Sequence, residues 1–150
     1  MGLTADLGPG AVAVDTVVLI HYIEEEPRFL ALIDPLFREA DEGVRLIVTS
    51  ALSLLEVLVV PLRVGDRALA ARYEALLTRS RGVRLVDVTR SQLRAAADLR
   101  AKTGVKTPDA LQLVAAVSAG CRTFLTNDRR VPPVPGLRIR QLDSYLPGSA

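Results

Sequence analysis

The sequence AVAVDTVVLIHYIEE, residues 11–25, decides the fold class, because a buried strand passes directly into a helix within it. Residues 11–14 form a short apolar run rich in valine, which predicts a strand that is buried on both faces. Asp15 ends the run, and residues 16–25 predict a helix with Asp15 in the N-cap position. A buried strand followed at once by a helix is the building unit of a parallel α/β sheet.

The same alternation of strand and helix continues to the end of the chain. Further strands are predicted at residues 45–49, 83–88, 123–126 and 137–142. The intervening helices are predicted at residues 27–42, 51–64, 66–79, 91–103 and 108–119. We therefore expect an α/β fold with a central, mostly parallel five-stranded sheet that helices cover on both faces.

Residues at the predicted helix ends agree with these boundaries. Asp66 can cap its helix, residues 89–92 (TRSQ) have the form of a capping box, and Thr107 precedes a proline as an N-cap would. Glycines 43, 104 and 120 lie where helices should end.

The length of 150 residues predicts a single domain, with residues 1–10 as a leader into the first strand and 144–150 as a tail. A hydrophobic content of 49% is high for so small a chain, so we expect part of its surface to be covered in an oligomer or by a partner. Cys121 is the only cysteine, which excludes an intramolecular disulfide and favours a reducing compartment. The lone His21 is better explained by helix packing than by metal binding.

No secretory signal or membrane span is predicted. The most apolar segment, residues 46–62, contains Glu56 and Pro61, which argues against a span. We therefore expect a soluble, cytoplasmic protein.

The basic residues do not establish a function by themselves. Net charge is only +2, and all of the 19 basic residues except Lys102 and Lys106 are arginines, whose planar fork suits phosphate groups. Pairs such as Arg129 and Arg130 can bind a nucleic acid or simply face solvent. Both interpretations stay open on charge alone.

Four acidic residues are the strongest candidates for a functional site: Asp15, Glu56, Asp109 and Asp128. In a parallel α/β sheet, ligands bind outside the carboxyl ends of the strands, and the predicted elements allow these acids to meet there. A cluster of carboxylates would require a compensating cation such as Mg²⁺ or Mn²⁺.

Each acid also has a structural explanation. Asp15 can be an N-cap, Asp109 can favour the first turn of a helix, and Asp128 can belong to a turn or pair with a neighbouring arginine. Glu56 is the hardest to explain, since apolar residues surround it in sequence; a salt bridge to a distant arginine is its alternative. The flanking polar residues can hold the carboxylates or metal-bound waters, or serve as caps and turns: Thr16, Ser50, Thr126 and Asn127.

Four segments together resemble the signature segments of the PIN-domain nucleases, particularly the VapC-type toxins of bacterial type II toxin-antitoxin pairs: VDTVVLIHYIE, TSALSLLEVLVV, KTPDALQLVAA and TFLTNDRR. The resemblance covers residues 12–140. It implies a PIN-like three-layer α/β/α sandwich in which Asp15, Glu56, Asp109 and Asp128 are the acidic residues, with Thr16 and Asn127 in the accompanying polar positions. The leader before Asp15 is longer than is usual in such toxins, and no segment indicates a particular RNA.

The resemblance further implies a Mg²⁺- or Mn²⁺-dependent endoribonuclease that forms a homodimer and is silenced by an antitoxin protein. Asp15, Glu56 and Asp109 are the expected principal metal ligands, with Asp128 as a fourth. Arg129, Arg130 and Lys106 are expected to bind the RNA backbone. The alternatives are a catalytically silent PIN-like module that binds RNA or a protein, and an RNA-processing nuclease without an antitoxin.

Residues 52–62 and 68–77 contain more apolar positions than one buried helix face requires. Either the core is thick there, or the segments form a surface for a dimer mate or for an antitoxin helix.

Overall fold

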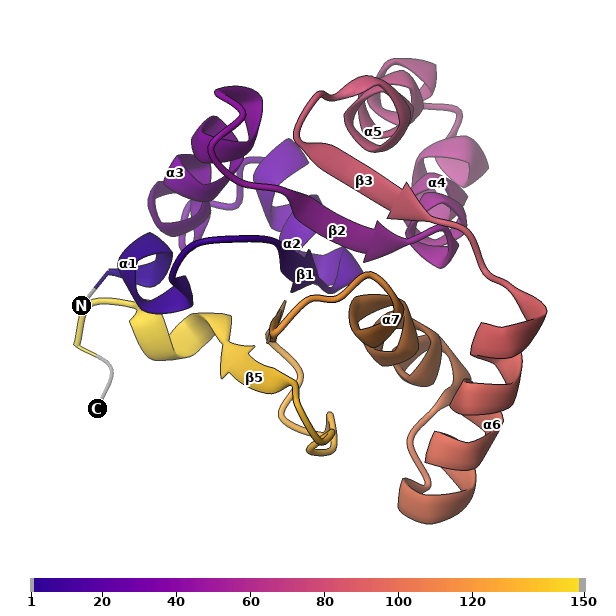
Figure 1. The fold of residues 1–150 in the computed structure, drawn as a ribbon. Coiled ribbons are helices and arrows are strands. Elements are labelled where there is room, and N and C mark those ends of the chain that lie inside the picture. The colour runs from indigo at the N-terminus through magenta and orange to yellow at the C-terminus, as the bar shows by residue number, and fades with distance from the viewer. Residues whose placement is uncertain (1, 149–150) are drawn as a thin grey trace.

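The structure is a computed structural model that describes residues 2–148, and its centre is a five-stranded sheet with helices on both faces (Figure 1). The strands lie in the order β3-β2-β1-β4-β5, and all neighbouring pairs are parallel. Their bounds are Val12–Val14 for β1, Ile47–Ser50 for β2, Val83–Val86 for β3, Thr123–Thr126 for β4 and Arg138–Gln141 for β5. The predicted α/β class and the five strands are confirmed.

The helices follow the predicted order, with short additions at both ends of the chain. They are α1 (Leu3–Leu7), α2 (Thr16–Ile23), α3 (Leu30–Asp41), α4 (Leu52–Val64), α5 (Arg67–Arg79), α6 (Arg90–Thr103) and α7 (Thr107–Ser118). A 3₁₀ turn, η1 (Leu142–Tyr145), follows β5.

Successive residues of each central strand pack into different apolar cores, as the pleat of a strand requires. In β1, Val12 and Val14 pack with residues from α1 to α5, whereas Ala13 packs with residues of α7 on the opposite face. Strands β2 and β4 divide their side chains in the same way. The two cores are the reason why the strand sequences are apolar throughout rather than alternating.

The leader contains a helix that the sequence analysis did not predict. Leu3 and Leu7 of α1 are buried against the core, and α1 packs on α3. Arg45 holds this segment in place: its guanidinium pairs with Glu39 at 2.7 Å and donates to the carbonyl oxygens of Thr4 and Gly10. A helix of five residues is too short to show a periodic pattern.

The predicted start of α3 is wrong by three residues, and those of α4, α5, α6 and α7 are wrong by one. Helix α3 begins at Leu30 rather than at residue 27, since Glu25 turns the chain with a φ of 52° and the first bonds are to the Glu26 carbonyl. In α7, Lys106 rather than Thr107 is the N-cap, and no side chain caps that end.

The predicted side-chain caps at Asp66 and Thr89 are present. The Asp66 carboxylate accepts from Leu69 N, as predicted. One of the two hydrogen bonds of the predicted capping box at residues 89–92 forms, because the Thr89 hydroxyl accepts from Gln92 N. The Gln92 side chain does not bond to the backbone of Thr89 in the described chain; its amide donates to Ser118.

Across residues 2–148, no helix combines the length and the apolar character that a membrane crossing requires.

Candidate functional site

The carboxyl ends of β1 and β4 place Asp15 beside Thr126. These strands are parallel neighbours, and the Asp15 backbone N–H donates to the Leu125 carbonyl at 2.9 Å. The Asp15 carboxylate caps α2 through Thr16 N at 2.7 Å, and its other oxygen accepts from the Thr126 hydroxyl at 2.8 Å. Asp15 is therefore both the helix cap and the first member of the site.

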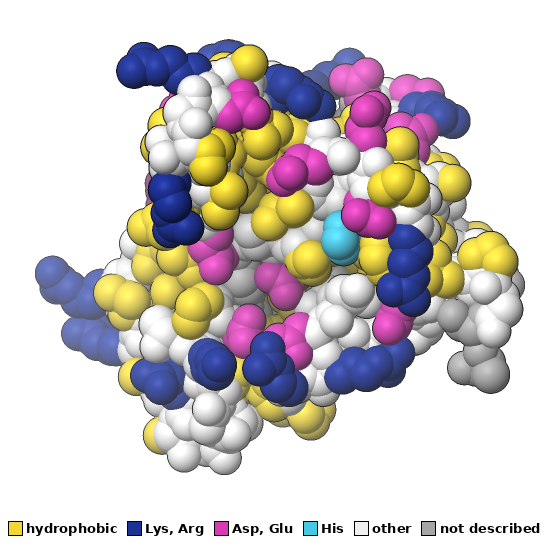
Figure 2. Space-filling view, turned by 180° about the vertical axis from the view of Figure 1, so that it is seen from behind, with side chains coloured by type: hydrophobic (Ala, Val, Ile, Leu, Met, Phe, Trp, Pro, Cys, Tyr) yellow, Lys and Arg dark blue, Asp and Glu magenta, His cyan; other side chains and the backbone are white. Residues whose placement is uncertain are grey.

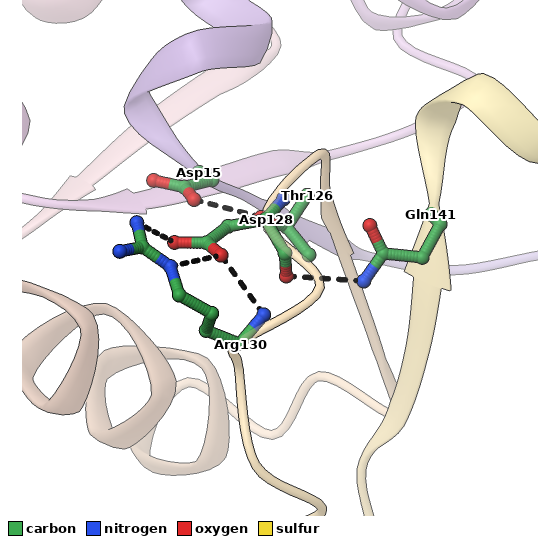
Figure 3. A network of polar contacts seen from close by, with 5 residues as sticks. All are labelled: Asp15, Thr126, Asp128, Arg130 and Gln141. Atoms are coloured by element: carbon green, nitrogen blue, oxygen red, sulfur yellow. Dashed lines mark hydrogen bonds and ion pairs between the residues drawn. The ribbon is translucent and has the colours of Figure 1, made fainter. Parts of the chain in front are cut away.

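Asp128 lies in the turn that follows β4. Its backbone N–H donates to the Thr126 hydroxyl at 3.1 Å, and its carbonyl accepts from the Gln141 amide at 3.1 Å (Figure 3). Its carboxylate pairs with the Arg130 guanidinium through two contacts of 3.0 Å each. These hydrogen bonds from Arg130 lower the pKa of Asp128. The pairing with a neighbouring arginine, left open by the sequence, does occur.

Glu56 reaches the same site from α4. The hydroxyl of Thr16 donates to its carboxylate at 2.8 Å, although the two residues are 40 positions apart in sequence. Within residues 2–148, Glu56 forms no ion pair. The alternative explanation, a salt bridge to a distant arginine, is therefore not realised in the described chain.

Asp109, in the first turn of α7, lies within the electrostatic influence of the other three acids. Burial raises its pKa, and repulsion by Asp15, Asp128 and Glu56 raises it further, against an opposing effect of Arg130. Burial likewise raises the pKa of Asp15, although its bonds from Thr126 and Thr16 oppose the change. The structure thus places all four acids near enough to influence one another electrostatically.

The face shown in Figure 2 has a hollow that acidic side chains surround, with Lys and Arg side chains along one side. This distribution agrees with an acidic centre that basic groups flank.

A buried polar network beneath the acids was missed by the sequence analysis. Gln112 of α7 is buried, and its amide donates to Ser53 at 2.8 Å and to Thr16 at 3.3 Å. Its carbonyl oxygen accepts from Ser50 N at 3.2 Å, and Ser53 also contacts Thr49 at 2.6 Å. The available signal was a lone glutamine in an apolar helix, one turn after Asp109.

The remaining predicted polar residues have local partners. Ser50 Oγ accepts from Leu52 N at the start of α4, and Asn127 Oδ1 accepts from Asp143 N. In the described chain, neither side chain bonds to one of the four carboxylates. Within residues 2–148, Thr16 and Thr126 are therefore the two members of this group that bond to the carboxylates, and contact of any of the four with metal-bound waters stays a prediction.

The three predicted RNA-binding residues differ in their partners and in their influence on the acids. Arg130 pairs with Asp128, whereas Arg129 pairs with Asp143 at 2.7 Å. Lys106 is exposed at the start of α7, and its charge contributes to the lowered pKa of Asp128. Their role in RNA binding stays a prediction.

His21 packs on a neighbouring ring, as expected, and Cys121 is buried. His21 stacks on Phe29 with ring centroids 4.5 Å apart. Cys121 is a buried free thiol whose pKa is raised by burial, which disfavours the reactive thiolate.

The donor set suits a hard divalent cation. Carboxylate oxygens are the ligands that Mg²⁺ and Mn²⁺ prefer, and a cation would relieve the repulsion that raises the pKa of Asp109. Between residues 2 and 148, however, no three acidic, histidine or cysteine side chains already converge as a metal cage. The carboxylates are of the ligand type that Mg²⁺ and Mn²⁺ prefer, but binding of the ion would have to draw them closer together.

Comparison with known proteins identifies one family. The family model described as the PIN domain matches residues 12–137. Among curated proteins no relative matches.

Solved structures with the same fold come from toxin-antitoxin complexes. A chain of the VapBC2 complex from Rickettsia felis, bound to a DNA fragment from their promoter, matches with a TM-score of 0.68, at 15% identity over 87% of this chain and 98% of that one. A toxin-antitoxin complex from Klebsiella pneumoniae matches with 0.57, at 19% identity over 87% and 97%. DNA-bound VapBC from Salmonella typhimurium matches with 0.61, at 19% identity over 88% and 98%.

Proposed function

The chain belongs to the PIN-domain family, and from this premise we propose that it is a metal-dependent endoribonuclease, the toxin of a toxin-antitoxin pair. The observation that supports the proposal most strongly is the mutual electrostatic influence of four acids from separate parts of the sequence: Asp15, Glu56, Asp109 and Asp128. The likeness to chains of VapBC complexes supports the toxin assignment.

Asp15, Glu56 and Asp109 are the proposed principal ligands of Mg²⁺ or Mn²⁺, directly or through water, with Asp128 as the fourth. A bound ion of this kind activates water and stabilises the charge that develops on phosphate oxygens. The proposed products are a 5′-phosphate and a 3′-hydroxyl.

The protein's own part in the reaction is to orient these carboxylates. Thr126 holds one oxygen of Asp15, and Thr16 holds one oxygen of Glu56. Gln112 in turn donates to Thr16, so that the hydroxyl has a fixed direction. Lys106, Arg129 and Arg130 are proposed to bind RNA phosphates.

Mapping of new 5′ ends in total RNA tests this function. The purified protein with Mg²⁺ or Mn²⁺ should produce discrete cuts that disappear with a chelator. Asp15→Asn should abolish them without unfolding the chain, because asparagine caps helices as well as aspartate does. Asp98→Asn is the matched control, since Asp98 pairs with Lys102 on the exposed face of α6. Absence of metal-dependent cuts, or equal cutting by Asp15→Asn, would refute the proposal.

The exposed face of α4 supports the proposed protein partners. Five large apolar side chains are exposed on this helix: Leu55, Val59, Val60, Leu62 and Val64. By contrast, Tyr73 and Leu77 of α5 are buried, so the excess of apolar residues is explained by the core in α5 but not in α4. We assign the α4 face to a homodimer mate or to the antitoxin.

Gel filtration with light scattering distinguishes these two occupants. The chain should be a dimer alone if a second copy covers α4, and a monomer that forms a complex with the product of an adjacent small gene if the antitoxin does. Leu55→Glu should disrupt the assembly in either case, whereas Leu93→Glu, a similar change on the exposed face of α6, should not. A monomer that binds no such product would contradict both assignments.

A further inference from the structure

Arg130 occupies most of the acceptor capacity of the Asp128 carboxylate. Its Nε donates to Oδ1 and its Nη2 to Oδ2, each at 3.0 Å, and its backbone N–H donates to Oδ1 at 2.9 Å (Figure 3). An ionised carboxylate has about four acceptor positions, of which these three donors use three. In this arrangement Asp128 has little capacity left for a metal ion.

The Arg130 side chain is held in the described chain by Asp128, with a weaker electrostatic attraction to Asp109. Its side chain is 76% exposed, and all its hydrogen bonds and ion pairs within residues 2–148 are to Asp128. Exposed ion pairs of this kind contribute little to stability and exchange readily with water. The guanidinium can therefore leave Asp128 without disturbing the fold.

A second environment for the guanidinium lies next to the acid cluster. Arg130 lines a cavity of about 180 Å³ together with Lys106, Asp109, Val105 and Pro132. Two cationic side chains on one small cavity suit a phosphate group, and the planar fork of arginine can bind two phosphate oxygens at once.

We infer that Arg130 is an exchangeable cation, which pairs with Asp128 while the acid cluster lacks a metal ion and moves to a backbone phosphate of the substrate when a divalent cation takes Asp128. The exchange follows from repulsion between two cations that compete for one carboxylate. It rests on the proposed function and adds a coupling to it: metal ion and RNA should each strengthen the binding of the other.

The first half of the inference is tested by Mn²⁺ affinity, measured by calorimetry on the full chain without nucleic acid. Arg130→Gln should bind Mn²⁺ about threefold more tightly than wild type, since the competing guanidinium is gone. Arg129→Gln is the matched control: it removes the same charge one residue away, but Arg129 pairs with Asp143, so Mn²⁺ affinity should not change. Arg130→Lys, which keeps the charge but not the two-point contact, should lie between wild type and Arg130→Gln.

Equal or weaker Mn²⁺ binding by Arg130→Gln would overturn this half, as would an equal gain in Arg129→Gln. The measurement does not depend on cleavage. A wild-type protein that cuts no RNA would therefore refute the proposed nuclease while leaving the Mn²⁺ comparison valid.

The second half is tested with single-stranded DNA of mixed sequence, used as a probe of backbone phosphates. With Mn²⁺ present, the slope of log affinity against log salt should be smaller by about 0.7 in Arg130→Gln than in wild type, the value for one lost phosphate contact. Without Mn²⁺ the difference between the two slopes should be smaller, because Asp128 then competes with the phosphate for Arg130. Equal slopes with Mn²⁺, a difference without Mn²⁺ as large as the difference with it, or no binding of the DNA by the Mn²⁺-loaded wild type would overturn the phosphate step.

Discussion

At the scale of single residues, the site shows that one side chain can be both a structural cap and a functional group. Asp15 caps α2 with one oxygen and meets Thr126 with the other. Asp128 is likewise a turn residue, the partner of Arg130 and a neighbour of the other acids. The structural explanations considered for these acids were correct, and they do not exclude the functional one.

Asp109 should destabilise the metal-free protein at neutral pH. Its pKa is raised in the folded state, so protonation of Asp109 stabilises the fold. This stabilisation is complete below the ordinary pKa of 3.8 and is lost as pH rises through the raised pKa of the folded state. Asp109→Asn should therefore be more stable than wild type at pH 7, by up to about 1 kcal/mol given partial solvent screening, and equal to it below pH 3.8.

Urea unfolding at several pH values in the presence of a chelator measures this difference. Glu74→Gln is the control, because Glu74 is an exposed carboxylate in the middle of α5. If Asp109→Asn is less stable than wild type at pH 7, repulsion among the acids is not the dominant effect.

Gln112 should matter more for stability than another buried glutamine. Gln112→Leu leaves buried hydrogen-bonding groups of Ser50, Ser53 and Thr16 without this partner, which should cost about 1–3 kcal/mol. Gln92→Leu is the matched control: Gln92 is also buried, but within residues 2–148 its side-chain carbonyl oxygen has no partner and its amide makes one long bond of 3.4 Å. Equal losses of unfolding free energy in the two variants would argue against the network.

At the scale of elements, two of the helices that approach the acids, α4 and α7, each contribute a polar pair one turn apart. Ser53 and Glu56 lie on one face of α4, and Asp109 and Gln112 on one face of α7. In both helices one member is the acid and the other belongs to the buried network. The helices are thus fixed to one another beneath the site, by hydrogen bonds rather than by apolar packing alone.

Helix α1 should be an integral part of the fold rather than a dispensable leader. Leu3→Ala should lower the free energy of unfolding by about 2–4 kcal/mol, because Leu3 is buried in the larger core. Leu93→Ala, on the exposed face of α6, should change it by less than about 0.5 kcal/mol. Chemical denaturation of both variants provides the comparison, and a neutral Leu3→Ala would show that α1 is only loosely attached.

At the scale of the whole molecule, the strand order determines where the acids meet. Strands β1 and β4 are neighbours at the centre of the sheet although more than a hundred residues separate them in sequence. Their carboxyl ends therefore bring Asp15 and Asp128 together, and α4 and α7 add Glu56 and Asp109 from the elements alongside. The acids repel one another in the absence of a cation, so the fold itself should be sensitive to metal ions.

Mn²⁺ should raise the thermal stability of the whole chain. A ligand that binds only the folded state at a hundred times its dissociation constant stabilises it by about 2.7 kcal/mol. Differential scanning calorimetry should show this shift in wild type, a smaller one in Asp15→Asn, and an unchanged one in Glu74→Gln. Identical shifts in wild type and Asp15→Asn would place the Mn²⁺ site elsewhere.

The sequence by itself determined the α/β class, the order of the elements and the candidate acids. These features depend on residues close together in the chain: apolar runs that end in Asp15 or Thr126, caps such as Asp66, and glycines after helices. The short helix α1 and the exact helix starts, above all that of α3, were not predicted, because five residues show no period and a turn at Glu25 is a property of the backbone.

Only the tertiary structure decided which side chains meet. The bond from Thr16 to Glu56, the contacts of Gln112 with three segments, and the position of Asp109 among the other acids all depend on strand order and helix packing. So does the exposure of the α4 face, since the large side chains of Tyr73 and Leu77 in α5 are buried. Local patterns specify elements, whereas the partners of a side chain are specified by every element that packs around it.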